Sequence, residues 1–83
     1  MAQNEIVVYG VTWCPDCRRS RRYLDQHSIA YRFLDIDTDM QARSYVEQVN
    51  KGNRSVPTIV FPDGSILVEP SDADLERKLR GIA

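Results

Sequence analysis

The sequence predicts an α/β fold, a mixed four-stranded sheet flanked by three helices in the order β-α-β-α-β-β-α. A helical segment separates the first two β-like segments, which should therefore pair in parallel through a right-handed crossover. A Pro-Asp-Gly turn separates two later β-like segments and favours an antiparallel hairpin. A final amphipathic segment predicts the third helix. A chain of 83 residues supports one core, so residues 1–83 are expected to form a single domain.

The first half of the chain predicts a strand, a helix and a second strand. Residues 5–11, EIVVYGV, are mostly β-branched or aromatic, which is typical of a buried strand. Pro15 suits the first turn of the following helix, where a missing N–H costs nothing, and residues 16–28 contain neither Gly nor Pro. Residues 31–36, YRFLDI, alternate well enough to predict the second strand.

A cap and an apolar stripe predict the second helix. Thr38 and Gln41 match the capping box. The apolar residues that follow have the i, i+3, i+4, i+7 spacing of one helical face and are Ala42, Tyr45, Val46 and Val49. Gly52 is expected to end this helix.

The remaining elements are a hairpin and a helix. TIVF at 58–61 and SILV at 65–68 flank the Asp63-Gly64 step, which is typical of a tight turn between antiparallel strands. Ser71, with Asp74 three residues later, is expected to cap the last helix.

The charge balance and the N-terminus exclude several classes of function. The chain has 11 basic and 12 acidic side chains, so its net charge of −1 offers no global field for nucleic acid. Its N-terminal apolar run is about five residues, far below the roughly 18 that span a bilayer, and no positive leader precedes it. We expect a cytoplasmic protein without a membrane segment. Four arginines between positions 18 and 22 form a local basic cluster, which is either a solvated helix face or part of the site.

The segment Cys14-Pro15-Asp16-Cys17 is the strongest candidate for chemistry. Two cysteines are too few for a disulfide scaffold, and a close pair in a reducing compartment more often does redox chemistry. Cys14 is expected where the first helix begins, where unpaired N–H groups and the helix dipole favour a thiolate. Cys17, one turn later, should be covered by the helix. We therefore predict that Cys14 is the nucleophile and that Cys17 resolves the mixed disulfide.

Neighbouring residues modify this picture. The Asp16 carboxylate disfavours a thiolate beside it, and Arg19, three residues later, is placed to pair with Asp16. Trp13 offers either an exposed flat contact for partners or a side chain packed against the loop at Val56. A zinc site needs four ligands, and beyond the two cysteines the chain offers only His27, which is expected at a surface or helix end. No metal is expected.

A Cys-Pro-x-Cys after the first strand, LDID at the end of the second and SVP before the third together resemble a glutaredoxin-like protein of the thioredoxin fold. The strings GNRSVPT and F-x-DGS, and P-S before the last helix, are most similar to mycoredoxins. The resemblance implies a thiol-disulfide oxidoreductase without bound cofactor, regenerated by a low-molecular-weight thiol, mycothiol or glutathione. By the same resemblance the protein is expected to act on protein disulfides or mixed disulfides, to have no nucleic acid or membrane partner, and to be a monomer.

The same resemblance implies where thiols or substrates bind. It predicts a cis bond between Val56 and Pro57 beside Cys14, with the Val56 backbone pairing with the bound cysteinyl group. The implied binding positions are Thr12, Trp13, Pro15, Asp16, Arg54, Val56, Pro57, Ser71 and Asp72. Two features of glutathione-dependent members are missing, because Val11 replaces a Lys and no Gly-Gly pair precedes the last helix.

Two alternative functions remain open from the sequence. One is a redoxin that serves ribonucleotide reductase and takes electrons from thioredoxin reductase. The other is a binding module that holds an iron-sulfur cluster between two protomers through Cys14 and external thiols. Carriers of such clusters usually have a single-cysteine Cys-Gly-Phe-Ser motif, so Pro15 and Cys17 argue against this alternative.

Overall fold

The computed structural model describes residues 5–82 and has the predicted order of elements. These elements are β1 (Ile6–Gly10), α1 (Pro15–Gln26), β2 (Tyr31–Asp35), α2 (Met40–Val49), β3 (Thr58–Val60), β4 (Ile66–Val68) and α3 (Asp72–Ile82). Each strand is slightly shorter than the segment predicted for it.

The four strands form one mixed sheet in the order β2-β1-β3-β4. β1 and β2 pair in parallel, whereas β3 is antiparallel to both β1 and β4. The predicted crossover, hairpin and α/β fold class are therefore confirmed. In the register of the central pair, Tyr9 lies opposite Thr58. This register brings the segment before β3 alongside the segment after β1, where the cysteine motif begins.

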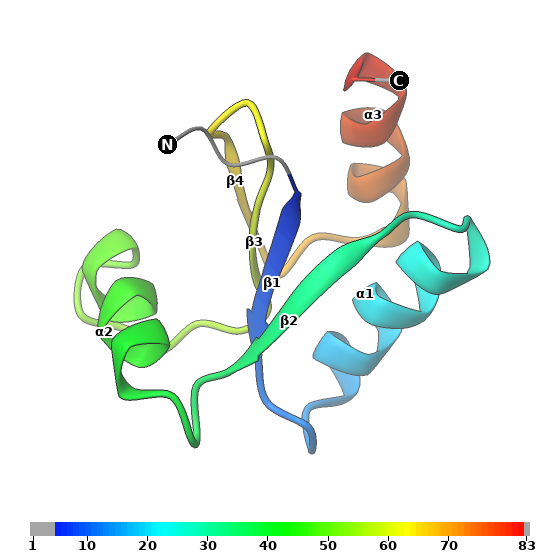
Figure 1. The fold of residues 1–83 in the computed structure, drawn as a ribbon. Helices are drawn as coiled ribbons and strands as arrows, with labels where there is room; N and C mark the ends of the chain where they lie inside the picture. The colour runs from blue at the N-terminus through cyan, green and yellow to red at the C-terminus, as the bar shows by residue number, and fades with distance from the viewer. Residues whose placement is uncertain (1–4, 83) are drawn as a thin grey trace.

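The helices form a layer on each side of the sheet. α1 and α3 lie side by side against one face, and α2 covers the other, as the ribbon shows (Figure 1). Each layer closes over an apolar cluster. The larger cluster contains Ile6, Val8, Leu24, Ile59, Phe61 and Leu75, and the smaller one contains Val11, Ile36, Ala42 and Val46. Within residues 5–82 the helices are too short or too polar to cross a bilayer.

The start of α2 differs from the prediction by one residue, whereas its end involves the predicted glycine. The capping side chain belongs to Asp39, whose carboxylate accepts the Ala42 N–H at 3.0 Å, and Thr38 instead contacts the Asp35 carbonyl. Both residue types cap helices well, and a one-residue difference in where the helix begins decides between them. At the other end the last helical residue is Val49, and Gly52 ends the helix as predicted, because its N–H bonds to the Glu47 carbonyl at 2.6 Å. The Asn50 side chain also donates to the Val46 carbonyl at 2.8 Å.

Other local predictions are confirmed. Pro15 is the first residue of α1. Ser71 and Asp74 form a reciprocal capping box at α3, in which each side chain accepts the other residue's N–H at 3.0 Å. In the β3–β4 connection Gly64 has a φ of +88°, a conformation that glycine adopts without steric cost.

Candidate redox site

Cys14 and Cys17 lie at the start of α1 in very different surroundings. Cys14 caps the helix: its sulfur accepts the Cys17 N–H at 3.2 Å, and the thiol is partly exposed. Cys17 is fully buried on the inner side of the same helix. A backbone N–H aimed at the Cys14 sulfur stabilises negative charge there. The two thiols are therefore chemically unequal.

The surroundings of Cys17 keep its thiol protonated. Burial, followed by the hydrogen bond with the Cys14 side chain, raises the pKa of Cys17 to about 12, although a hydrogen bond from the Val11 backbone acts in the opposite direction. Desolvation has this sign because it penalises the charged thiolate. At neutral pH the buried Cys17 is a thiol.

Gly10, at the end of β1, makes room for this buried sulfur. A Cβ at position 10 would lie 2.9 Å from the Cys17 sulfur and 3.3 Å from the Phe33 ring. The sequence signal for such a residue is a glycine inside a strand, which often marks a close approach, but the partner is visible only in the fold. Gly10 is a site residue that motif reading missed.

The peptide bond between Val56 and Pro57 is cis, as the family resemblance implied. Pro57 is fully buried and directly precedes β3, while Val56 and Cys14 both pack against the cluster that contains Val11. Within residues 5–82, the N–H and C=O of Val56 have no hydrogen-bond partner. An unpaired donor and acceptor thus lie beside the cysteine motif, available to an extended backbone.

A second missed residue, Asn50, fixes the loop that carries Val56. The Asn50 amide donates to the Val46 carbonyl at 2.8 Å and to the Thr58 hydroxyl at 3.1 Å. Thr58 in turn donates to the Ser55 carbonyl at 2.7 Å. These bonds connect the end of α2 to both ends of the segment around Pro57. Asparagine is common in turns, so the residue type alone did not indicate that Asn50 fixes this loop.

Trp13 is exposed and is held by a residue from another loop. Its side chain is 68% exposed, and its indole N–H donates to the Asp37 carboxylate at 2.8 Å. Of the two predicted roles for Trp13, this exposure favours the flat contact for partners over packing against the loop at Val56. Thr12, just before it, is exposed as well.

Arg19 joins the start of α1 to the start of α3. Its guanidinium pairs with the Asp16 carboxylate, as predicted, and also contacts the Asp72 carboxylate at 3.4 Å and the Pro70 carbonyl at 3.3 Å. The negative charge of Asp16 is thereby balanced beside the cysteines, and Ser71 and Asp72 are tied to the same side of the molecule.

The predicted site residue Arg54 forms an ion pair with a residue of α2. Its side chain pairs with Glu47 of α2 at 2.7 Å.

His27 lies at the end of α1 with its ring 4.2 Å from that of Tyr23, so the helix-end expectation is confirmed. Across residues 5–82, His, Cys, Asp and Glu side chains do not gather in threes that could bind a metal ion.

A buried thiol and a capping thiol at one helix start, next to a cis-proline loop, define a thiol-disulfide oxidoreductase of the thioredoxin fold. Residues 6–66 match the glutaredoxin family, and the chain belongs to that family.

Relatives and solved structures agree with this assignment. The Mycobacterium tuberculosis protein Rv3198A, which is named as a glutaredoxin, is 41% identical to this chain over 83 residues. The match covers 100% of this chain and 99% of the relative. Mycoredoxin 1 of Corynebacterium glutamicum is 35% identical, covering 96% of this chain and 99% of its own. Among solved structures, Archaeoglobus fulgidus glutaredoxin has a TM-score of 0.75 at 26% identity, covering 93% of this chain and 87% of its own.

Proposed function

We propose that this protein reduces protein disulfides or mixed disulfides with Cys14 as the nucleophile and Cys17 as the resolving cysteine. The observation that carries the proposal is the inequality of the two thiols. Cys14 is partly exposed and accepts a backbone N–H at 3.2 Å, whereas Cys17 is buried with a pKa raised to about 12. The partly exposed Cys14 sulfur can meet a substrate, and the buried Cys17 thiol is hydrogen-bonded to the Cys14 side chain.

The proposed reaction has two exchange steps. The Cys14 thiolate attacks one sulfur of the substrate disulfide, so that a Cys14–substrate bond forms and the other sulfur leaves as a thiolate that takes up a proton. Cys17 then gives up its proton, and its thiolate attacks the Cys14 sulfur, so that the Cys14–Cys17 bond forms, the Cys14–substrate bond breaks and the departing substrate sulfur takes up the proton. The protein is left with a Cys14–Cys17 disulfide, and the substrate has gained two electrons.

The bound cysteinyl group needs a backbone partner during these steps. The free N–H and C=O of Val56 support that role, since they lie on a loop fixed by Asn50 and Thr58. The exposed Trp13 ring, oriented by Asp37, offers an apolar contact on the same end of the fold. The remaining proposed contacts are Thr12, Pro15, Asp16, Arg54, Pro57, Ser71 and Asp72.

We infer that mycothiol, rather than glutathione, restores the dithiol. Two molecules of thiol supply the two electrons and leave as their own disulfide. In glutathione-dependent members, the positions of Ser71 and Asp72 hold the γ-glutamyl end of glutathione. Here the Asp72 carboxylate already faces the Arg19 guanidinium, which competes with a charged amino group. Mycothiol has no such amino group, and the similarity to Mycoredoxin 1 supports the same choice.

Trapping tests the two cysteine roles. The Cys17→Ser variant, incubated with a small disulfide, should accumulate one mixed disulfide on Cys14, detected by intact mass and peptide mapping. The matched Cys14→Ser variant should accumulate none at neutral pH, because Cys17 is buried and protonated. A stable adduct on Cys17 in the second variant would reverse the assignment.

A regeneration assay tests the electron donor. The oxidised protein is supplied separately with mycothiol, with glutathione and with a thioredoxin reductase system, and free Cys14 is measured over time. Mycothiol should regenerate the thiol fastest. Faster recovery with thioredoxin reductase would favour a redoxin of the ribonucleotide reductase type, and faster recovery with glutathione would refute the donor proposed from Arg19 and Asp72.

A further inference from the structure

Three arginines on α1 carry charge that the rest of the fold does not balance. Arg18, Arg21 and Arg22, named here the α1 basic face, have no ion-pair partner within residues 5–82. Six other basic residues form ion pairs, namely Arg19, Arg32, Arg54, Arg77, Lys78 and Arg80. Arg43 and Lys51 form none within residues 5–82 either, but they lie apart from each other at the two ends of α2, whereas the three arginines of α1 are neighbours. Because the net charge of the chain is only −1, this face is a local feature and not a general excess of positive charge.

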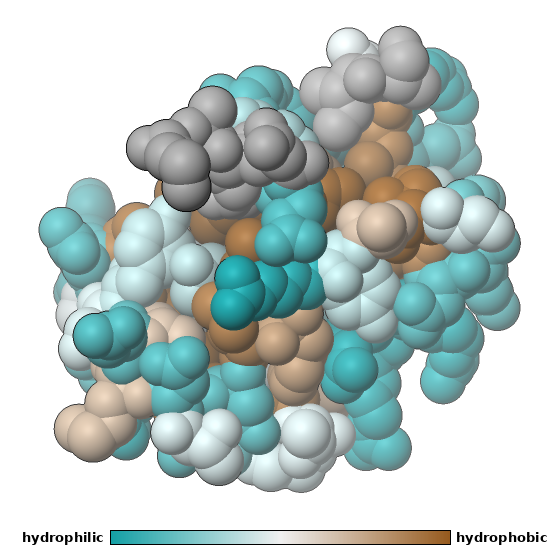
Figure 2. Space-filling view, in the orientation of Figure 1, coloured by the Kyte–Doolittle hydropathy of each residue, from teal (hydrophilic) through white to brown (hydrophobic). Residues whose placement is uncertain are grey.

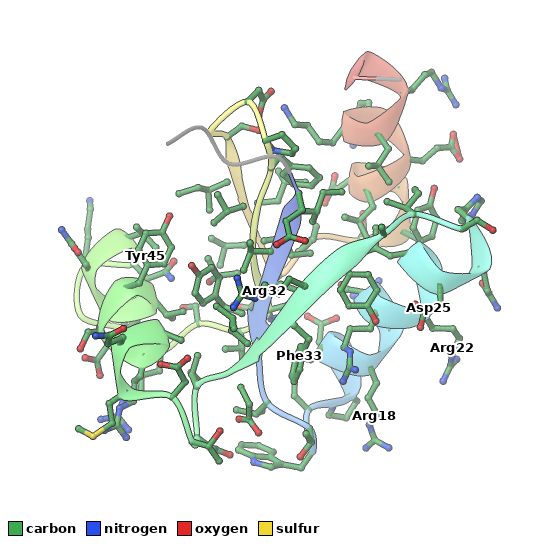
Figure 3. All side chains as sticks on the ribbon, viewed as in Figure 1. Arg18, Arg22, Asp25, Arg32, Phe33 and Tyr45 are labelled. Atoms are coloured by element: carbon green, nitrogen blue, oxygen red, sulfur yellow. The ribbon has the colours of Figure 1, made fainter. Side chains whose placement is uncertain are left out.

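The spacing of the three residues puts them together. Positions three and four apart on a helix are neighbours, and like charges there destabilise a helix by about 0.2 to 0.5 kcal/mol per pair. Arg18 and Arg22 are exposed, and both extend away from the ribbon of α1 (Figure 3). The space-filling view shows a hydrophilic surface along this side of the molecule (Figure 2). Within residues 5–82 none of these arginines forms an ion pair that would offset the repulsion among them.

The α1 basic face borders a shallow depression. One hollow of about 320 Å³ is lined by the three arginines and Asp25, and an adjoining hollow of about 410 Å³ shares Arg21 and Asp25. Arg21 is oriented there, since its guanidinium lies 3.9 Å from the centre of the Phe33 ring and its Nε donates to the Tyr31 hydroxyl at 3.3 Å. An arginine held in this way keeps its charge in place without the entropy cost of ordering it on binding.

The α1 basic face begins one helical turn from the redox site. The Arg18 N–H bonds to the Cys14 carbonyl at 3.0 Å, and Arg22 follows one turn later. Four and eight residues of helix correspond to about 6 and 12 Å along the axis. An extended segment advances about 3.3 Å per residue, so these distances match side chains roughly two to four positions from a cysteine that reacts with Cys14.

We propose that the α1 basic face docks an acidic segment of the protein whose disulfide is reduced, with Asp or Glu two to four positions from its reacting cysteine. The proposal rests on the proposed role of Cys14. Charge complementarity carries it: carboxylates would pair with guanidinium groups that form no ion pair within residues 5–82, and Arg binds carboxylates in a defined geometry. A neutral low-molecular-weight thiol has no carboxylate to place there. The α1 basic face would therefore bind protein substrates and not the small-thiol donor.

Designed peptides supply the probe. Three extended peptides carry one cysteine as a mixed disulfide with 2-mercaptoethanol and differ only in their flanks, which are glutamate, lysine or serine at two to four positions on both sides. At about 0.01 M salt, the kcat/KM for the glutamate peptide should exceed that for the lysine peptide about tenfold or more. At about 1 M salt, where the screening length falls to about 3 Å, the difference should disappear.

Matched variants assign the effect to the α1 basic face. Arg18→Gln with Arg22→Gln should remove most of the charge preference, and Arg18→Glu with Arg22→Glu should reverse it in favour of the lysine peptide. Arg77→Gln with Arg80→Gln, on α3, is the control and should keep the full preference, because both arginines already pair within their own helix. The rate with bis(2-hydroxyethyl) disulfide should change less than about twofold in all three variants, since an uncharged substrate does not sense these side chains.

The outcomes separate the two proposals. No activity on bis(2-hydroxyethyl) disulfide in the unmodified protein would refute the dithiol function itself. Full activity on that substrate, with equal rates for the three peptides at low salt, would refute the docking surface alone. A short oligothymidylate that binds the unmodified protein more tightly than the glutamate peptide, and loses binding in the Arg18→Gln/Arg22→Gln variant, would assign the face to nucleic acid and overturn the proposal.

Discussion

The two faces of the sheet carry cores of different size and different purpose. The cluster under α1 and α3 contains six buried residues, including Phe61 and Leu75, and aromatic side chains pack at its edge. The cluster under α2 contains four, and the groups packed against it include Cys14 and Val56. The larger core holds α1 and α3 to the sheet, whereas the smaller core holds α2 and supports the redox site. Changes in these two regions should therefore have different consequences.

Truncation of the larger core gives the greatest expected effect on stability. Phe61 is fully buried, and Phe61→Ala should lower the free energy of unfolding by about 3 to 5 kcal/mol. The rate of mixed-disulfide formation by the remaining folded protein should change little. The matched change in the smaller core, Val46→Ala, removes fewer atoms and should lower the free energy of unfolding by less. It should nevertheless slow mixed-disulfide formation by roughly ten- to a hundredfold, because Val56 and Cys14 pack against this core and lose support. Denaturant unfolding and stopped-flow kinetics measure both quantities, and equal kinetic effects would contradict the division.

Substitution of Gly10 tests how closely the Cys17 side chain is packed against β1. In Gly10→Ala the new Cβ would lie 2.9 Å from the Cys17 sulfur, so the sulfur or the strand must move. We expect a loss of about 1 to 3 kcal/mol in unfolding free energy and slower release of substrate from the mixed disulfide. Gly81→Ala is the control, since nothing lies within 4 Å of its added Cβ and it should be neutral or slightly stabilising. Identical behaviour of the two variants would show that Cys17 is not confined.

Asn50 connects the smaller core to the loop that carries Val56. Asn50→Ala removes the bonds to the Val46 carbonyl and the Thr58 hydroxyl, which should cost about 1 to 2 kcal/mol of unfolding free energy. The KM for a small mixed disulfide should rise more than kcat falls, because the binding loop loosens while the thiols are untouched. In the control Asn53→Ala, only a bond to the Asn50 carbonyl is lost, so both constants should stay near those of the unmodified protein. A loss of stability with unchanged KM would leave Asn50 a purely structural cap.

The buried Cys17 thiol predicts a pH effect on the reduced protein. The pKa of Cys17 is raised from 9.0 to about 12 in the folded state, so the folded protein keeps a proton that the unfolded chain releases. The stabilisation is complete below pH 9 and is lost between about pH 9 and 12, with a slope of about 1.4 kcal/mol per pH unit. Urea unfolding of the reduced protein at a series of alkaline pH values measures this slope. In Cys17→Ala the slope should be shallower by that amount, and parallel curves would contradict the burial account.

Local rules predicted most of the fold. Pro15 at the first helical position, the Ser71–Asp74 capping box and the Asp63-Gly64 turn are all interactions within four residues, so sequence spacing is enough to find them. The start of α2 was wrong by one residue for the same reason, because Thr38 and Asp39 satisfy the same local rule. The proposed roles of Cys14 and Cys17 follow from their positions relative to the start of one helix.

Long-range contacts in the site were beyond such rules. The Trp13–Asp37 bond joins residues 24 apart, and the contact between Arg19 and Asp72 joins residues 53 apart. Whether Gly10 faces Cys17, or Arg19 reaches α3, depends on how strands and helices pack, so the residue type alone does not identify the partner. The sequence predicted which groups react, whereas the structure shows what holds and surrounds them.

Selective alkylation of the reduced protein tests the inequality of the thiols most directly. Limiting iodoacetamide at neutral pH, followed by peptide mapping, should label Cys14 almost exclusively, and Cys17 should become reactive only when the protein is unfolded in denaturant. Labelling of Cys17 in the folded protein at a rate equal to or above that of Cys14 would contradict the assignment of nucleophile and resolving cysteine.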